Sequence, residues 1–191
     1  MGIHTLAGRA VFLDRDGVIN RAVVRDGRPY PPSSLAELEL LPDVHEALAR
    51  LRSAGFRLIV VTNQPDVARG AQTREAVEAI HAALLAAGLP IDDFRVCYHD
   101  DGDRCDCRKP EPGLLLAAAR EHDLDLTASF MIGDRWRDVE AGRRAGCTTI
   151  FIDYGYAEVE PSLPDLRVKS LNEGVDWILS REREKQIESA Q

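Results

Sequence analysis

Short apolar runs alternate along the chain with longer segments of helical periodicity. The runs that predict buried strands are Ala10–Asp14, Arg57–Thr62, Phe94–Tyr98, Phe130–Gly133 and Thr148–Ile152. Apolar residues at helical spacing predict helices over Val44–Ala54, Thr73–Ala87, Gly113–Glu121, Arg137–Ala145 and Ser170–Ser180. This alternation predicts an α/β fold, a three-layer doubly wound arrangement in which helices cover both faces of a parallel sheet.

Residues with special backbone preferences mark the boundaries of these elements. Gly55, Gly88 and Gly146 follow predicted helices, where C-terminal caps occur, and Thr73 is a suitable N-cap. The segment 21–42 is rich in Pro and Gly and predicts a loop over the carboxyl edge of the sheet. We find no second domain boundary, so residues 1–180 are expected to form one domain and the polar residues 181–191 a tail that frays.

Composition and charge narrow the class of protein. The chain has 191 residues, 45% of them hydrophobic and 29% charged, which is ordinary for a globular domain with its own core. It has no apolar stretch of the roughly 20 residues that cross a bilayer and no secretory signal, so we expect a cytoplasmic location. The net charge of −8 argues against nucleic-acid and membrane partners. The oligomeric state is not determined by the sequence, and a monomer fits it.

Two carboxylates alternate at the end of the first predicted strand. Asp14 and Asp16 are followed by Gly17, which permits a sharp turn. The carboxyl ends of parallel strands are where α/β sheets place their ligands. One such carboxylate can act as a nucleophile, the other can move protons, and together they can hold a divalent cation. Alone, the pattern is equally typical of a plain turn with solvated acids, so its interpretation depends on the clusters downstream.

Polar side chains also follow the second and fourth predicted strands. Thr62 and Asn63 can donate hydrogen bonds to a phosphoryl oxygen, although a plain strand-end turn is an equal alternative. If a helix begins just after Asp134, Asp138 lies one turn later on about the same side. It can then complete a set of oxygen ligands for Mg²⁺ with Asp14 and the carbonyl of Asp16. Alternatively, Asp134 caps the helix and Asp138 offsets its dipole; both can be true.

Three of the four cysteines and a histidine cluster within a few residues of one another. Cys97, His99, Cys105 and Cys107 form a Cys₃His set, which is a closed tetrahedral site for a structural zinc ion. The ion would hold the short polar loop 100–104, which cannot fold by burial. The alternative is a group of reduced surface cysteines with an incidental histidine. Cys147, beside an apolar run, is expected to be a small buried core residue.

Two cations follow the last of these cysteines directly. Arg108 and Lys109 would be held over the sheet edge by the zinc loop, where lysine suits a phosphoryl oxygen and arginine can bind in a bidentate manner. An acidic protein needs such local cations for an anionic substrate. The alternative is that both are solvated. The remaining histidines, expected to be solvated and without a role, are His4, His45, His81 and His122.

The order of these clusters resembles the haloacid dehalogenase superfamily of phosphohydrolases over nearly the whole chain. The motifs Asp14-Arg15-Asp16-Gly17-Val18-Ile19-Asn20, Thr62-Asn63-Gln64, Cys-x-His…Cys-x-Cys and Arg108-Lys109-Pro110 are similar to its zinc-loop subgroup of heptose bisphosphate and histidinol-phosphate phosphatases. The resemblance implies a strand order of 5-4-1-2-3. The connecting segments leave room only for loops, so we expect no large cap domain.

The resemblance implies a role for each matching residue. Asp14 would be the nucleophile that forms an aspartyl-phosphate, and Asp16 the general acid and base. Thr62 and Lys109 would stabilise phosphoryl oxygens. The remaining roles are substrate recognition by Asn63, Arg108 and Arg69, and Mg²⁺ binding by Asp14, Asp16, Asp134 and Asp138.

The features that bear on the substrate disagree. The segment Ala68-Arg69-Gly70 resembles the heptose enzymes, but Pro65-Asp66 replaces their usual Ser-Gly. The five residues between His99 and Cys105 are closer to the loop of the histidinol-phosphate enzymes. The favoured substrate is D-glycero-D-manno-heptose 1,7-bisphosphate, with histidinol phosphate or another small sugar phosphate as the alternative. A non-enzymatic zinc-stabilised binding module is the alternative from another class, but it would not need the catalytic-type acids.

Overall fold

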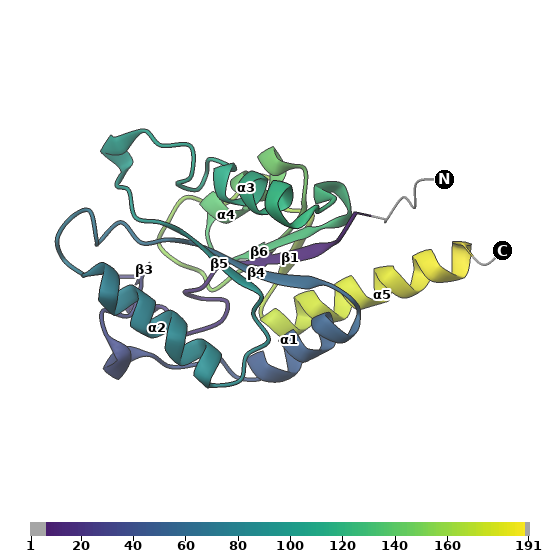
Figure 1. Cartoon of the computed structure of the whole chain (residues 1–191), viewed down its shortest axis with the longest axis horizontal. Coiled ribbons are helices and arrows are strands. Elements are labelled where there is room, and N and C mark those ends of the chain that lie inside the picture. The colour runs from purple at the N-terminus through teal and green to yellow at the C-terminus, as the bar shows by residue number, and fades with distance from the viewer. Residues whose placement is uncertain (1–6, 190–191) are drawn as a thin grey trace.

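A six-stranded parallel sheet forms the centre of the protein in the computed structural model, which describes residues 7–189 (Figure 1). Its order is β5 (Asp93–Cys97), β4 (Arg57–Asn63), β1 (Ala10–Leu13), β6 (Phe130–Gly133), β7 (Thr148–Ile152) and β8 (Leu166–Val168). All neighbouring strands pair in parallel. The five predicted strands are confirmed, and so is their implied order, to which the short strand β8 is added at one edge.

Helices cover both faces of this sheet, as predicted. Figure 1 shows α3 (Gly113–His122) and α4 (Trp136–Ala145) on one side, and α1 (Val44–Ser53), α2 (Arg74–Ala86) and α5 (Leu171–Ser189) on the other. Alternate residues of β1 enter the two cores: Val11 and Leu13 join one hydrophobic cluster, whereas Ala10 and Phe12 join the other. Because both faces of the central strand are buried, its sequence is a continuous apolar run rather than an alternating one.

The signals that bounded the helices are confirmed in the backbone. Thr73 Oγ accepts the N–H of Ala76 at 3.1 Å, as an N-cap does. Gly146 adopts a φ of 88° directly after α4, a left-handed conformation that favours glycine. Cys147 is buried in the core beside it, as predicted. Among the described residues, no helix has the length and apolar character that crossing a membrane requires.

The segment 21–42 differs from the predicted loop. It contains an antiparallel hairpin of β2 (Val23–Arg25) and β3 (Arg28–Tyr30), followed by the 3₁₀ turn η1 (Leu35–Glu37). The hairpin forms because Asp26 and Gly27 both take positive φ angles, 51° and 74°, the backbone that a tight hairpin turn requires. Within residues 7–189 there is no large cap domain, so the prediction of an open site holds.

The last helix continues past its predicted end. Helix α5 runs to Ser189, whereas the sequence predicted its end at Ser180, and the fraying expected of residues 181–191 stays a prediction. Glu182 is buried and pairs with Arg9, which ties the helix to the start of the domain. The division at residue 180 stays a prediction, and residues 190–191 lie outside the described part, as does His4.

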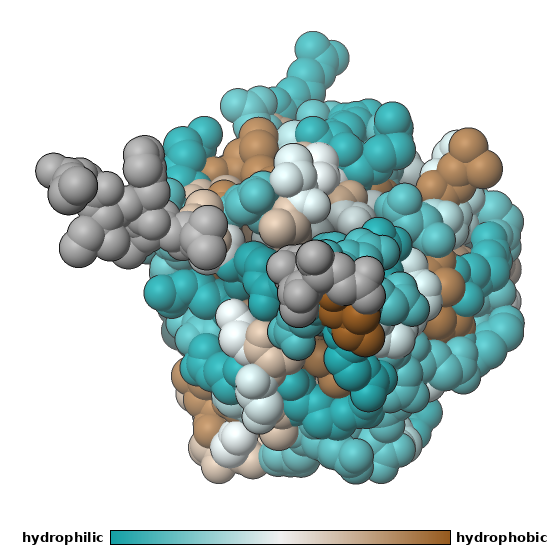
Figure 2. All heavy atoms as spheres, turned by 90° about the vertical axis from the view of Figure 1, so that its right-hand side faces the viewer, coloured by the Kyte–Doolittle hydropathy of each residue, from teal (hydrophilic) through white to brown (hydrophobic). Residues whose placement is uncertain are grey.

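The face that carries both ends of the described chain is mostly hydrophilic. Figure 2 views the molecule from that side, and apolar residues are scattered over it among polar ones. Monomeric proteins tolerate such scattered apolar residues, whereas extended apolar patches mark interaction surfaces. The strands of Figure 1 begin near this side, so their carboxyl ends, where the predicted site residues lie, point away from it.

Candidate active site

Three carboxylates and a lysine converge at the carboxyl edge of the sheet. Asp14 follows β1, Asp134 follows β6, and Asp138 lies in the first turn of α4. Lys109 Nζ lies 2.8 Å from Asp14 Oδ1 and 2.6 Å from Asp138 Oδ1, and it donates to the carbonyl of Val61 at 2.7 Å. Oxygens of the three carboxylates lie within 4.8 Å of one another. The predicted convergence of these groups is therefore confirmed.

Burial and repulsion from neighbouring acids make Asp14 and Asp134 harder to ionise. Burial first, and then Asp138 and Asp16, raise the pKa of Asp14 to about 6 although Lys109 opposes the shift. Burial, Asp14 and Asp138 raise the pKa of Asp134 well above its usual value. Burial alone would lower the pKa of Lys109, but Asp138 and Asp14 outweigh it, so the lysine remains charged. The cluster has more negative charge than Lys109 can offset.

The carboxylate of Asp134 is the clearest sign of a cation site. Both of its oxygens are buried, and neither accepts a hydrogen bond from any residue in the described range 7–189. The Tyr156 phenol lies close enough to interact with it but lacks hydrogen-bond geometry. A Cβ atom on Gly17, whose φ is +93°, would lie 1.8 Å from Asp134 Oδ2. Buried, unpaired carboxylate oxygens are ligands for a hard divalent cation, so this set fits Mg²⁺.

The beginning of α4 fixes the position of Asp138. The N-cap is Arg135 rather than Asp134, and Asp138 Oδ2 accepts the N–H of Arg135 at 2.9 Å. A Cβ atom on Gly133 would lie 2.1 Å from the Asp138 Cβ, so only glycine allows this close approach. One oxygen of Asp138 thus accepts a hydrogen bond at the helix N-terminus, and the other forms an ion pair with Lys109.

Asp16 is held by four donors at the same edge. Arg15 donates through Nε at 3.0 Å and through a terminal nitrogen at 3.1 Å, and Asn20 and Gln64 donate at 2.9 Å each. Burial alone would raise the pKa of Asp16, but these partners outweigh burial and lower it. Asp16 is therefore ionised in this arrangement. It lines the same cavity as Asp14, Thr62 and Lys109.

The two polar residues at the end of β4 have different surroundings. Thr62 Oγ1 accepts from Gln64 Nε2 at 2.9 Å, which leaves its own hydrogen for donation. The Asn63 amide donates to the Lys109 carbonyl and accepts the Lys109 N–H, both at 3.0 Å. Asn63 therefore fixes the backbone of Lys109, and its predicted contact with the substrate stays a prediction.

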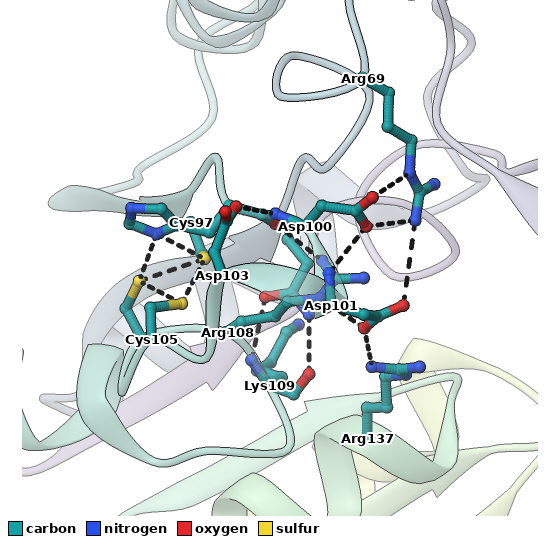
Figure 3. A network of polar contacts seen from close by, with 12 residues as sticks. Arg69, Cys97, Asp100, Asp101, Asp103, Cys105, Arg108, Lys109 and Arg137 are labelled. Carbon is teal, nitrogen blue, oxygen red and sulfur yellow. Dashed lines mark hydrogen bonds and ion pairs between the residues drawn. The ribbon is translucent and has the colours of Figure 1, made fainter.

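The thiol and imidazole groups lie together at the end of β5 (Figure 3). Cys97 Sγ is 3.1 Å from Cys107 Sγ and 3.7 Å from Cys105 Sγ, and His99 Nδ1 is 3.2 Å from Cys107 Sγ. Tetrahedral zinc with bonds near 2.3 Å separates its sulfur ligands by about 3.8 Å. The donor set and its spacing therefore fit a zinc ion.

Arginines gather around Asp101, which lies in the loop between His99 and Cys105 (Figure 3). Asp101 Oδ1 accepts from Arg108 Nε at 2.8 Å and from Arg137 at 3.0 Å. Arg69 forms two hydrogen bonds with Asp100, at 3.0 and 2.5 Å. Asp101 and these three arginines line a cavity of ≈ 200 Å³, the arginine cavity, that shares residues with the cavity of Asp14; both are bordered by Pro29, Tyr30, Pro31, Asn63, Arg135 and Arg137.

Some residues of this region were not found from the sequence. Arg137 was treated only as the beginning of a helix, and Arg28 as part of a loop, yet both line the arginine cavity. His81 was expected to be solvated, but it is 3% exposed. A signal was present, because His81 falls on the apolar stripe of Val77 and Ile80 at helical spacing.

Comparisons with known proteins agree with this site. Residues 106–173 match a family model described as HAD-hydrolase-like. A D-glycero-D-manno-heptose-1,7-bisphosphate 7-phosphatase of Thermosynechococcus vestitus is 35% identical over 191 aligned positions, covering 88% of this chain and 94% of that protein. A corresponding β-heptose enzyme of Helicobacter pylori is 34% identical, covering 89% of this chain and 97% of the relative.

A solved structure extends the similarity to three dimensions. The D,D-heptose 1,7-bisphosphate phosphatase from B. bronchiseptica, complexed with magnesium and phosphate, aligns with a TM-score of 0.74 and 30% sequence identity. The alignment covers 91% of this chain and 99% of that structure. The identity and coverage of these relatives, together with the convergent acids and lysine, place the chain in the D-glycero-D-manno-heptose-1,7-bisphosphate 7-phosphatase family of haloacid dehalogenase-like phosphatases.

Proposed function

We propose that this chain is a Mg²⁺-dependent phosphomonoesterase that removes the 7-phosphate of D-glycero-D-manno-heptose 1,7-bisphosphate through an aspartyl-phosphate. The observation that carries the proposal is the buried cluster in which Lys109 Nζ lies 2.8 Å from the Asp14 carboxylate, beside the unpaired Asp134. The names of the relatives support the substrate. The magnesium and phosphate bound to the solved relative support the chemistry.

The nucleophile in this proposal is Asp14. Its carboxylate attacks phosphorus, the bond to the leaving oxygen breaks, and the phosphoryl group is held on Asp14 until water hydrolyses it. Lys109 offsets the repulsion between this carboxylate and the dianionic phosphate, and Thr62 donates to a phosphoryl oxygen. Mg²⁺, when held by Asp14, the carbonyl of Asp16, Asp134 and Asp138, supplies the further positive charge that the phosphoryl oxygens require.

Asp16 is the proposed general acid and base. In the first step it gives a proton to the leaving alkoxide, and in the second it accepts one from the attacking water. The donors that surround it favour its carboxylate form. This form suits the second step, and for the first step Asp16 has to be protonated when the negatively charged substrate binds, since that charge opposes a nearby carboxylate.

The arginine cavity supports a substrate with two phosphates. Arg69 and Arg108, predicted to bind substrate, line it together with Arg28 and Arg137. A phosphate held at Asp14 shares its cavity with Arg137 but not with the other three arginines, and the second phosphate of a sugar bisphosphate would extend the negative charge toward them. Guanidinium groups bind such oxygens in a bidentate manner, at the expense of the present contacts with Asp101.

A structural zinc ion completes the proposal. Cys97, His99, Cys105 and Cys107 would hold it in a closed tetrahedral set, without an open position for catalytic water. The ion would fix the loop that carries Asp101 and Arg108. Its role is therefore to position the substrate-binding arginine rather than to take part in the reaction.

Turnover of two substrates tests the proposal. Phosphate release from heptose 1,7-bisphosphate and from histidinol phosphate would be measured at equal concentrations in the presence of Mg²⁺. We expect kcat/KM for the bisphosphate to be at least about tenfold higher, because one additional charged contact contributes roughly 1.5 kcal/mol or more. Faster turnover of histidinol phosphate would overturn the substrate. No release from any phosphate ester would favour the binding module.

A further inference from the structure

Arg15 is a buried cation that the proposed reaction does not use. Its side chain is 0% exposed, and the guanidinium makes contacts in two directions. Toward the active site it donates to both oxygens of Asp16, at 3.0 and 3.1 Å. On the other side its remaining terminal nitrogen lies 3.1 Å from His81 Nε2. A guanidinium without access to water depends on such partners, since an unpaired N–H would be costly.

The chemistry of this contact assigns the tautomer of His81. Arginine can only donate, so His81 Nε2 must accept, and the imidazole proton is on Nδ1. Nδ1 lies 3.4 Å from Glu78 Oε2, and the other oxygen of Glu78 accepts from the Tyr98 phenol. Burial first, and then Arg15, lower the pKa of His81, while Glu78 and Asp16 oppose the shift. The imidazole is therefore neutral and able to accept.

The ring of His81 is also fixed in orientation. It stacks on Phe94 with ring centroids 4.4 Å apart and an interplanar angle of 21°. Contacts with Arg15 at Nε2, with Glu78 at Nδ1 and with Phe94 across the ring face together fix the plane of the imidazole. A fixed acceptor behind the guanidinium determines the plane of the Arg15 fork, and that fork meets the carboxylate of Asp16.

We propose that His81 is a positioning residue for Asp16, acting through Arg15. This inference rests on the proposed function, because it matters for catalysis only if Asp16 transfers the proton. Without the His81 acceptor, the terminal nitrogen of Arg15 loses its hydrogen-bond partner, and the guanidinium tilts toward a different acceptor. Asn20 and Gln64 still donate to Asp16, so the carboxylate stays in the cavity but loses its precise direction.

The leaving group distinguishes this role from simple packing. A sugar alkoxide is strongly basic and leaves readily only when Asp16 protonates it, whereas 4-nitrophenolate leaves with little assistance. The ratio kcat/KM covers the steps up to release of this first product. A defect transmitted to Asp16 therefore lowers kcat/KM for the sugar phosphate more than for the aryl phosphate. A loss of packing lowers both alike.

Substitutions at His81 with different reach provide the test. In His81→Gln the amide oxygen can take the place of Nε2, whereas in His81→Asn the shorter side chain cannot reach Arg15. His81→Phe keeps the stacking on Phe94 but has no acceptor, and His45→Ala on the exposed side of α1 is the matched control. Folding would be checked by thermal melting.

We expect Asn and Phe at position 81 to lower kcat/KM for heptose 1,7-bisphosphate roughly 10- to 100-fold, which is part of the rate enhancement that a general acid provides. For 4-nitrophenyl phosphate, kcat/KM should fall by less than about threefold. Gln at this position should restore the wild-type ratio of kcat/KM for heptose 1,7-bisphosphate to kcat/KM for 4-nitrophenyl phosphate. Equal losses on both substrates, or failure of Gln to restore the ratio, would overturn the inference.

Two further measurements keep the outcomes separate. Asp16→Asn should show the same preference for the aryl phosphate; if it does not, the proposed role of Asp16 fails and this inference with it. If Asp16→Asn discriminates but the His81 variants do not, only the inference fails. In the wild-type protein, the ¹⁵N chemical shifts of His81 at neutral pH should show a proton on Nδ1 alone. A proton on Nε2 would overturn the inference without any variant.

Discussion

The two groups of metal-type ligands in this protein are built in contrasting ways. The carboxylate cluster, Asp14, Asp134 and Asp138, is placed by β1, β6 and α4, elements that the sheet and both cores hold in position. The thiol cluster, Cys97, His99, Cys105 and Cys107, begins at the end of β5, but its other members lie on the short polar segment around η2 (Asp101–Asp103). One set converges because the sheet places all of its members, whereas in the other the cysteines pack on one hydrophobic core and His99 and residues 101–104 are exposed.

This difference predicts opposite consequences of losing an ion. The carboxylates repel one another and remain in place because the sheet holds them, so a cation there relieves an existing electrostatic cost. The thiols of a polar loop gain their arrangement from the ion, since metal binding and local folding are coupled in such sites. Loss of Mg²⁺ should therefore abolish activity with the fold intact, and loss of zinc should disturb the fold.

The largest expected effect comes from Asp14→Asn. The variant removes the proposed nucleophile, so kcat/KM for 4-nitrophenyl phosphate should fall at least about a thousandfold, equivalent to roughly 4 kcal/mol. Because one of several crowded charges is neutralised, the melting temperature should stay the same or rise. Near-normal turnover would show that Asp14 is not the nucleophile, and a large drop in melting temperature would show that its charge supports the fold.

Next in size is the effect of Cys107→Ser on stability. Purified wild-type protein should contain about one zinc ion per chain, and the variant should lose most of it. The melting temperature should fall by at least about 10 °C, which corresponds to roughly 3–4 kcal/mol for a domain of this length. Cys147→Ala, a buried thiol outside the cluster, should keep the zinc. An unchanged melting temperature in Cys107→Ser would remove the structural role of the metal.

The elements that the sequence predicts well are those formed by burial. The central strands are apolar runs because both of their faces are covered, and this signal is local. The hairpin of β2 and β3 was missed because its strands are short and mostly exposed, although Asp26-Gly27 is a hairpin turn signal. Strand β8 has three residues at an edge, too few for a periodic pattern.

The same distinction applies to the site. Residues at strand ends, such as Asp14 and Asp134, could be brought together from the sequence because parallel strands end at one edge. Arg137 could not, since the path of the zinc loop, which brings Asp101 and Arg108 to this side chain at the start of α4, has no signal in the sequence. His81 was missed for another reason: its polar side chain was interpreted as solvated, although its position on α2 faces the core.

A third prediction concerns the carboxylate cluster and pH. The folded-state pKa of Asp14, about 6, lies above its ordinary value of 3.8, so protonation favours the folded protein. This contribution is fully present at low pH and is lost as the pH rises through about 6. Mg²⁺ then takes the place of the proton. We expect Mg²⁺ at about 100 times its Kd at pH 8 to raise the melting temperature there by roughly 8 °C, from a stabilisation of about 2.7 kcal/mol, and the same concentration to raise it by less than about 2 °C at pH 5.

Melting curves with and without Mg²⁺ at the two pH values measure this difference. Asp134→Asn should reduce the rise at pH 8, because it removes the carboxylate with unpaired oxygens. An equal rise at both pH values would mean that ion binding does not require deprotonation of these acids.

The smallest expected effect is at Arg137, where the two clusters meet. Arg137 extends from α4, which carries Asp138, and donates to Asp101 of the zinc loop at 3.0 Å. Arg137→Met should raise KM for heptose 1,7-bisphosphate roughly 10-fold, since one charged contact contributes about 1.5 kcal/mol, and should change KM for 4-nitrophenyl phosphate by less than about twofold. Arg144→Met is the matched control, because Arg144 lies on the same helix but pairs with Glu140 and Glu111.

The direction of the Arg137 result separates two ways in which the zinc loop can matter. If the loop only supports the fold, Arg137→Met affects both substrates alike or neither. If the loop and α4 together form a site for the second phosphate, the loss is confined to the bisphosphate. Asp101→Asn should then lower KM for that substrate, because the carboxylate that now occupies Arg108 and Arg137 competes with the phosphate. A higher KM in Asp101→Asn would instead show that Asp101 aligns these arginines for binding.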